Sequence, residues 1–442
     1  MKRLVPAVLA LLVSGCGSMN PFGWLAPEEV TDPPAELVPI SNQFQIHQLW
    51  AGTVGQGADE KSAKLVPQVD GERLFIASGD GIVMALNAIT GKPLWRVQTG
   101  LEISGGPGVD GELVFVGTRD AELVALSSET GEEQWRAPVS SEILSVPKSA
   151  LGVVVVHTVD GKLFGFDVLD GRQIWLYERP IPVLTLHGSS SPAVSGGRVL
   201  VGFASGKLVA LDILNGTLLW ETSVTLPSGR SELERMVDID GDPLVMGGLV
   251  FVTTYQGQLA AVGEDNGSVF WRKDLSAYSD IRADWRGLYV SDAAGQVWAF
   301  DPGNGVALWK NKDLLNRGLS APAVLGDYVV VGDFEGYLHW LSSVDGGLVA
   351  RVRVGSEPIL SPIVADDRLY VYGTGGDLAV FAVGDSQGGE STRYYFGTLD
   401  PIGGDETGIT DTPDFGTRIQ RDYDAESSGF DSTLPAGSRE NY

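Results

Sequence analysis

The sequence contains a repeat of about 40 residues, which constrains the fold more than any other feature. Six copies share a glycine that is followed four positions later by a tryptophan, as in GKPLWRV and GEEQWRA. These glycines are Gly91, Gly131, Gly171, Gly216, Gly267 and Gly305, and the tryptophans are Trp95, Trp135, Trp175, Trp220, Trp271 and Trp309. Successive tryptophans lie 38 to 51 residues apart. This period is typical of the four-stranded blades of a β-propeller.

Each repeat has the pattern of short β-strands joined by tight turns. Upstream of the glycine lies a block such as RLFIASGDGIVMALNAITG, in which two segments rich in apolar residues are separated by Gly and Asp. The glycine before each tryptophan is expected to form a turn with φ > 0. The indole can then pack between neighbouring sheets. Because no segment with a helical period separates the strands, the sequence predicts an all-β fold.

The two ends of the chain decide the number of blades. A seventh unit keeps a glycine, Gly347, and carries Arg351 at the tryptophan position. The following segment, LSPIVADDRLYVYGTGGDLAVFAVG, supplies only three strands, whereas FQIHQLWAG near the N-terminus supplies one strand that ends in Trp50. We therefore predict an eight-bladed β-propeller of four-stranded antiparallel blades, closed by the N-terminal strand. The alternative is a seven-bladed ring in which residues 44–50 only lead into the first blade.

The N-terminus has the pattern of a secretory signal. Lys2 and Arg3 precede an apolar run of about ten residues, and small residues then lead to Cys16, the only cysteine of the chain. The stretch LVSGC resembles a bacterial lipobox, which implies that residues 1–15 are removed and that Cys16 is acylated. Gly17 rather than aspartate follows Cys16, which implies the periplasmic face of the outer membrane. An ordinary signal peptide with an incidental cysteine is the alternative.

The segments that flank the repeats differ from them in composition. Residues 16–43 contain five prolines and are predicted to be a flexible tether, and residues 44–384 are predicted to form the propeller. Residues 385–442 contain 12 acidic and 4 basic residues and are predicted to be a disordered acidic tail. The net charge of −26 argues against nucleic-acid binding, because phosphate backbones would repel the chain. An acidic chain also gains no electrostatic attraction to anionic lipids, so acylation is the expected means of membrane attachment.

The repeat resembles the PQQ-type repeat of quinoprotein dehydrogenases, and the chain from residue 16 to about 384 resembles the BamB family of outer-membrane assembly factors. The likeness is strongest in VVGDFEGYLHWLSSVDG. It implies a non-catalytic scaffold without a cofactor that binds the periplasmic domains of BamA in the β-barrel assembly (BAM) complex. A quinoprotein oxidoreductase that holds pyrroloquinoline quinone and Ca²⁺ is one alternative, although such enzymes commonly use a pair of adjacent cysteines. A glycan-binding propeller is another.

Two long connections between repeats are the candidate partner-binding loops. The tryptophan spacing rises to 45 and then 51 because of ERPIPVLTLHGSSSP and SVTLPSGRSELERMVDIDGDP. The first connection carries Leu184 and Leu186, and the second carries Asp238 and Asp240, so apolar anchors are expected beside fixed charges. Alternatively, the leucines are buried in a blade and the aspartates only cap turns.

The family resemblance assigns these loops to BamA binding. BamB proteins carry a Leu-x-Leu-Arg-Gly stretch and an Asp-x-Asp stretch on neighbouring loops, which correspond here to LTLHG and DID. His187 stands in place of the arginine, and its ordinary pKa leaves it mostly neutral at pH 7. A permanent ion pair is therefore not expected at that position, and Arg235 is the candidate substitute.

No catalytic or metal-binding motif accompanies these loops. The four histidines have no metal-ligand spacing and are predicted to be structural or on the surface. DIDGD at residues 238–242 superficially resembles a calcium loop, but Pro243 stands where the loop needs glycine and no glutamate closes it. Neither a Gly-x-Ser-x-Gly elbow nor a phosphate loop occurs in the sequence.

Overall fold

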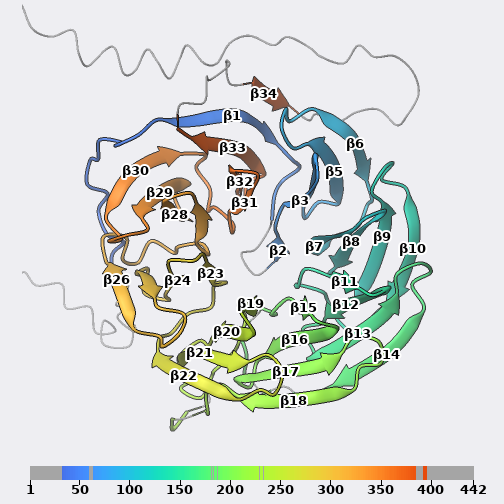
Figure 1. Cartoon of the computed structure of the whole chain (residues 1–442). Coiled ribbons are helices and arrows are strands. Elements are labelled where there is room, and N and C mark those ends of the chain that lie inside the picture. Colours follow the sequence, from blue (N-terminus) through green and yellow to red (C-terminus); the bar gives the residue numbers. More distant parts are fainter. Residues whose placement is uncertain are drawn as a thin grey trace, which may run out of the picture. The chain divides into compact units, whose positions relative to one another are not determined.

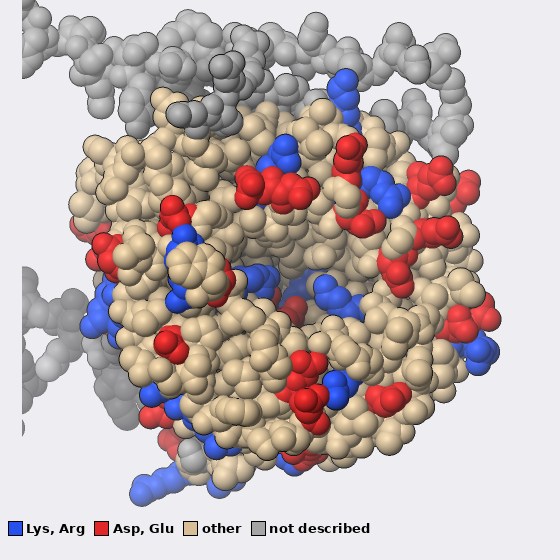
Figure 2. Space-filling view, viewed as in Figure 1, with Lys and Arg blue, Asp and Glu red and all other residues tan. Residues whose placement is uncertain are grey.

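A computed structural model describes residues 32–58, 63–180, 182, 184–186, 188–227, 229–231 and 233–384, together with the backbone of 392–395. These residues belong to one compact unit, Met1–Phe396. Within them every regular element is a β-strand, and the strands form eight sheets arranged as blades around a central hollow (Figures 1 and 2). The described part of the chain contains no helix that is long and apolar enough to cross a membrane.

The strands of the first four blades follow the chain from the axis outward. Blade 1 contains β3 (Gln68–Asp70), β4 (Arg73–Ala77), β5 (Ile82–Asn87) and β6 (Pro93–Gln98). Blade 2 contains β7 (Ile103–Asp110), β8 (Leu113–Thr118), β9 (Glu122–Ser127) and β10 (Glu133–Pro138). Blade 3 contains β11 (Lys148–Ala150), β12 (Val153–His157), β13 (Lys162–Asp167) and β14 (Gln173–Glu178). Blade 4 contains β15 (Ala193–Ser195), β16 (Arg198–Phe203), β17 (Lys207–Asp212) and β18 (Leu218–Ser223).

The remaining blades repeat this arrangement until the ring closes. Blade 5 contains β19 (Leu244–Met246), β20 (Leu249–Thr253), β21 (Gln258–Gly263) and β22 (Val269–Asp274). Blade 6 contains β23 (Arg282–Ala283), β24 (Leu288–Ser291), β25 (Val297–Phe300) and β26 (Ala307–Asn311). Blade 7 contains β27 (Ala323–Leu325), β28 (Tyr328–Gly332), β29 (Tyr337–Ser342) and β30 (Leu348–Arg353). Blade 8 contains β31 (Ile363–Ala365), β32 (Arg368–Tyr372), β33 (Asp377–Val383) and the N-terminal β1 (Ile46–Thr53).

The N-terminal strand closes the ring. β1 runs antiparallel to β33 from the pair Ile46 and Val383 to the pair Thr53 and Asp377, so the two ends of the propeller share one sheet (Figure 1). The predicted eight-bladed closed propeller is confirmed, and the seven-bladed alternative is wrong.

Two sheets carry a fifth, parallel strand that the sequence analysis did not predict. β2 (Lys64–Leu65) pairs with the edge of β7, and β34 (Thr392–Tyr395), inside the predicted acidic tail, pairs with β1. Both strands satisfy backbone groups on a blade edge that would otherwise be open.

The repeated tryptophans hydrogen-bond each blade to the next. In blades 1 to 6 the indole N–H of the outer-strand tryptophan donates to a backbone carbonyl of the following blade over 2.8–3.0 Å. Trp50 in β1 makes the same bond from blade 8 to Ala88 of blade 1. The turn glycine of the following blade lies against each ring: Gly131 has φ +76°, and a Cβ there would lie 2.7 Å from Trp95. The predicted positive φ and the predicted indole packing are both confirmed.

The seventh blade corrects the alignment of its repeat. The N–H of Gly346 bonds to the Ser342 carbonyl, as turn glycines do in the other blades, so Gly346 rather than Gly347 is the repeat glycine. Four positions later stands Ala350, not Arg351. Trp340 on β29 lies opposite Ala350, whereas in blades 1, 2, 4, 5 and 6 the tryptophan is on the outer strand and the alanine is on its neighbour. The prediction for Arg351 was wrong because two adjacent glycines leave the alignment ambiguous, and a shift of one residue reverses the faces of a strand.

The hydrophobic core is divided into clusters between neighbouring blades. Between blades 3 and 4, for example, Val155 and Trp175 pack with Val201, Val209 and Leu211, all of them buried. Each blade therefore buries its apolar faces against its two neighbours, and the closed ring provides a neighbour for every blade.

Part of the segment predicted to be a tether contacts the propeller. The N–H of Ala35 bonds to the Leu315 carbonyl over 2.9 Å, and the N–H of Gln43 bonds to the Val349 carbonyl over 2.9 Å. Residues 16–31 of the tether, including Cys16, lie outside the described residues. So does the predicted acidic tail, apart from the backbone of β34.

Candidate functional site

The two candidate loops lie side by side between blades 3, 4 and 5. The backbone N–H of Leu186 donates to the Asp238 carboxylate over 2.5 Å, and the N–H of Ser191 donates to Asp242 over 2.6 Å. Residues 52 and 51 positions apart are thus joined by two hydrogen bonds. The surplus residues of the two long connections therefore build one continuous surface. We name residues 184–188 and 238–240 the two-loop patch.

Apolar side chains reach solvent on both connections. Leu184 is 46% exposed, whereas Leu186 is only partly exposed beside its bond to Asp238. The second connection exposes Leu226 and Leu233 to 73% and 61%. Sequence reasoning did not select these two leucines, although their signal, an apolar residue inside a polar loop, was the one used for Leu184. Exposed leucines on adjacent loops are suited to contact with another protein.

Asp238 does not present an exposed charge, which corrects the expectation from the sequence. Asp238 is fully buried, and burial raises its pKa to about 7. One of its carboxylate oxygens accepts the Leu186 N–H and the other has no hydrogen-bond partner. Asp240 is partly exposed, and burial raises its pKa to about 6 despite the opposing charge of Lys64. Asp238 therefore holds the first loop in place.

The family's arginine position, residue 187, adjoins a glycine that lies close to the second loop. His187 lies outside the described residues. The following residue, Gly188, is close to the second loop, because a Cβ there would lie 3.1 Å from a carboxylate oxygen of Asp240. Arg235 is exposed, and its guanidinium donates to the Gly229 carbonyl over 3.2 Å, within its own connection.

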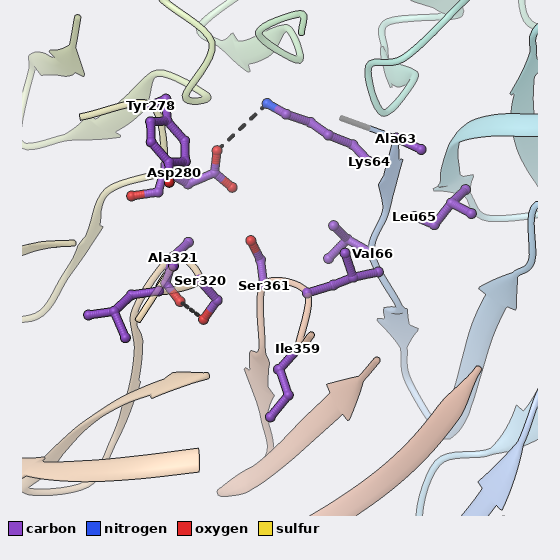
Figure 3. Close-up of a pocket in the computed structure, with 14 residues that line it drawn as sticks. Ala63, Lys64, Leu65, Val66, Tyr278, Asp280, Ser320, Ala321, Ile359 and Ser361 are labelled. Carbon is purple, nitrogen blue, oxygen red and sulfur yellow. Dashed lines mark hydrogen bonds and ion pairs between the residues drawn. The ribbon is translucent and has the colours of Figure 1, made fainter. Parts of the chain in front are cut away.

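A lysine near the axis connects the patch to the inside of the ring. The segment between β1 and β3 places β2 inside the ring, where the ammonium of Lys64 lies 2.5 Å from Asp242 and 3.7 Å from Asp280 (Figures 1 and 3). The same ammonium donates to the backbone carbonyl of Asp240 over 2.7 Å. Burial would lower the pKa of Lys64, but the charges of Asp242 and Asp280 outweigh it and raise the pKa. Lys64 thus holds the second loop from the inside of the ring, through its contacts with Asp240 and Asp242.

Sequence reasoning missed Lys64 for an identifiable reason. Its partner Asp242 is 178 positions away, and no local motif links the two. Beside Lys64 lies a cavity of about 140 Å³ whose lining includes Val66, Ser320 and Ile359 (Figure 3).

The buried histidines are structural. His157 is buried with its ring Nδ1 2.9 Å from the Ser190 carbonyl, and burial lowers its pKa to about 4. His339 is buried with its Nε2 2.9 Å from Asp333. Among the residues described, no three His, Cys, Asp or Glu side chains are grouped closely enough to hold a metal ion.

The chain matches one family over most of its length. A family model described as "Outer membrane protein assembly factor BamB" matches residues 47–103, 79–311 and 299–388. The outer membrane protein assembly factor BamB of Alkalilimnicola ehrlichii is 46% identical over 379 residues, which cover 86% of this chain and 96% of that protein. The protein of the same name from Pseudomonas aeruginosa is 42% identical over 383 residues, covering 86% and 99% of the two chains.

Solved structures agree with this match. The crystal structure of BamB from Moraxella catarrhalis superimposes with a TM-score of 0.71 at 29% identity, covering 76% of this chain and all of that one. A quinohemoprotein alcohol dehydrogenase from Comamonas testosteroni gives a TM-score of 0.61 at 14% identity, covering 79% and 78% of the two chains. At that identity the dehydrogenase is similar in fold alone.

Proposed function

Because the chain belongs to the BamB family of outer membrane protein assembly factors, we propose that it is a non-catalytic scaffold that binds BamA through the two-loop patch. The observation that carries this proposal is the pairing of the two loops. The Leu186 N–H bonds to Asp238, and solvent-exposed leucines lie on both connections. A preformed apolar surface of this kind binds a partner without first having to order its own loops.

The chemistry near the axis supports a scaffold rather than an enzyme. The ammonium of Lys64 is engaged by Asp242 and Asp280, and Arg282 lies 3.4 Å from Asp280. These carboxylates act as partners for fixed cations. A general base or a ligand for a cofactor would instead need free lone pairs directed at a substrate.

The proposed location combines the family with the N-terminal motif. A member of this family acts at the outer membrane, and acylated Cys16 would hold it there on the periplasmic side. The described residues from Pro33 onward contact the propeller, so the tether would consist of residues 16–32. Several acyl chains on one cysteine would suffice for stable anchoring.

Co-purification tests the binding surface. The wild-type chain and the Leu184→Ala/Leu186→Ala variant would be isolated from solubilised outer membranes, and recovered BamA would be quantified. We expect at least about tenfold less BamA with the variant, since removing a central apolar anchor costs about 2 kcal/mol or more. The control is Leu169→Ala/Leu214→Ala, which removes two leucines that are 82% and 52% exposed on turns of blades 3 and 4. Equal recovery with all three proteins would reject the two-loop patch.

A further inference from the structure

The central hollow of this acidic protein contains basic side chains. The chain carries a net charge of −26, yet Figure 2 shows Lys and Arg inside the hollow while Asp and Glu are spread over the surrounding face. A cavity of about 500 Å³ lies between the inner strands, with Lys148 of β11 and Arg282 of β23 on its wall. Its lining contains no carboxylate.

Lys148 has no counter-ion in this cavity. It forms no hydrogen bond or ion pair with the residues that the structure describes. The two carboxylates whose charges act on Lys148 are already engaged, because Asp242 accepts from Lys64 and Ser191, and Asp280 accepts from Arg282 and from the Asp242 N–H. Burial lowers the pKa of Lys148 even though these two carboxylates act in the opposite direction.

An unpaired cation in a partly buried site is costly unless a partner of opposite charge is supplied. Around Lys148 the wall of the cavity is apolar, with Val69, Val324, Ile363 and Val364 facing the same space. A fitting ligand must therefore offer two things at once. It needs an anionic group for Lys148 and Arg282, and an apolar body for the valines and the isoleucine.

We infer that the cavity at Lys148 and Arg282 binds an organic carboxylate with an apolar substituent. The carboxylate would accept charge-assisted hydrogen bonds from the lysine ammonium and from N–H groups of Arg282 other than those that donate to Ile281 and Asp280, and the substituent would lie against Val324 and Val364. A volume of about 500 Å³ is within the range of small-molecule sites. Inorganic phosphate matches the charge but leaves the apolar wall unfilled. This site is separate from the two-loop patch and does not depend on BamA binding.

The test uses three probes on the intact chain. N-acetylleucine has the carboxylate and the apolar side chain, N-acetylleucinamide has the same shape without the charge, and sodium phosphate has the charge alone. Binding would be measured by saturation-transfer NMR and by calorimetry. We expect N-acetylleucine to bind and the other two probes to bind at least about tenfold more weakly, as expected for loss of a charge-assisted contact or of apolar burial.

Variants then assign the site. Lys148→Gln should weaken binding of N-acetylleucine by about tenfold or more, because it removes the cation. Lys148→Arg should retain binding, because it keeps a cation at this position. Lys92→Gln, which removes an exposed lysine from an outer turn, should bind as the wild type does. Since Lys148 has no hydrogen-bond or ion-pair partner to lose among the described residues, Lys148→Gln should melt at or above the wild-type temperature. The inference fails if the amide binds as tightly as the acid, if phosphate equals N-acetylleucine, or if Lys148→Gln binds normally.

Discussion

The N–H of Leu186 donates a hydrogen bond to the buried carboxylate of Asp238 over 2.5 Å, and this bond fixes one candidate binding loop on the other. The aspartate that would have supplied a charge to a partner instead faces inward. Its role is to hold Leu184 and Leu186 where a partner can reach them. The surface offered to that partner is therefore mainly apolar.

Burial of Asp238 predicts a pH dependence of stability. Its pKa is about 7 in the folded chain against about 4 when unfolded, so the folded state holds the proton more tightly between these values. Stability should therefore fall as pH rises from about 4 to 7, by about 1–4 kcal/mol from this group. Asp238→Asn keeps an acceptor for Leu186 but cannot ionise, so it should flatten that fall. Urea denaturation at pH 5 and pH 8 measures the difference, and an unchanged slope in the variant would contradict the burial effect.

Removing Lys64 should destabilise the chain. Lys64→Gln leaves Asp242 and Asp280 without their shared cation, and breaking a buried pair in this way costs about 3 kcal/mol. Lys64→Gln/Asp242→Asn should recover part of the loss, because it also removes one unpaired charge. Denaturation curves give the values, and hydrogen exchange at the Ser191 amide reports whether the second loop loosens. Lys92→Gln is the control for removing an exposed lysine.

Closure of the ring by β1 predicts a strong effect at Trp50. This side chain is 1% exposed and bonds to the Ala88 carbonyl of blade 1. Trp50→Ala should cost about 3–5 kcal/mol in unfolding free energy. Trp285→Ala removes a tryptophan that is 84% exposed and should change stability by about 0.5 kcal/mol or less. Equal losses for the two variants would mean that β1 does not close the ring.

Alanine substitutions at two glycines distinguish the cost of backbone strain from the cost of steric contact. Gly131 and Gly71 both have positive φ, but a Cβ at Gly131 would meet Trp95 at 2.7 Å, whereas nothing lies within 4 Å of a Cβ at Gly71. Gly71→Ala should cost about 1–2 kcal/mol through strain alone. Gly131→Ala should cost clearly more, because the indole must also move. Thermal melts of both variants measure the difference, and equal melting temperatures would contradict the packing of Trp95 on the next blade.

The lipid anchor gives the last prediction. Cys16 is the only cysteine, so Cys16→Ala should abolish incorporation of a labelled fatty acid and release the protein from the membrane fraction. Cys16→Ser is a matched variant that keeps the size of the side chain, and it should behave in the same way. Label retained by either variant would show that acylation occurs elsewhere.

The regular parts of this protein were readable from the sequence because they are local and repeated. The glycine and the tryptophan four positions later mark each turn and outer strand, and the spacing of Trp50 from Trp95 predicted the closure of the ring. Blade 7 shows the limit of such alignment. Adjacent glycines hid the exchange of Trp340 and Ala350, which only the hydrogen-bond register decided.

The chemistry of the loops was decided by the tertiary structure. The spacing of the repeats located both connections, and with them Leu184 and Leu186, but not the inward direction of Asp238 or the contact of Lys64 with Asp242. Whether a carboxylate is an exposed charge or a buried acceptor depends on which distant groups fold against it. Blades 2, 3, 5 and 6 bring Lys64, Lys148, Asp242 and Asp280 to one axis only when the ring closes. The sequence shows each of these residues but not the distances between their side chains. Those distances determine whether each side chain is charged and what role it has.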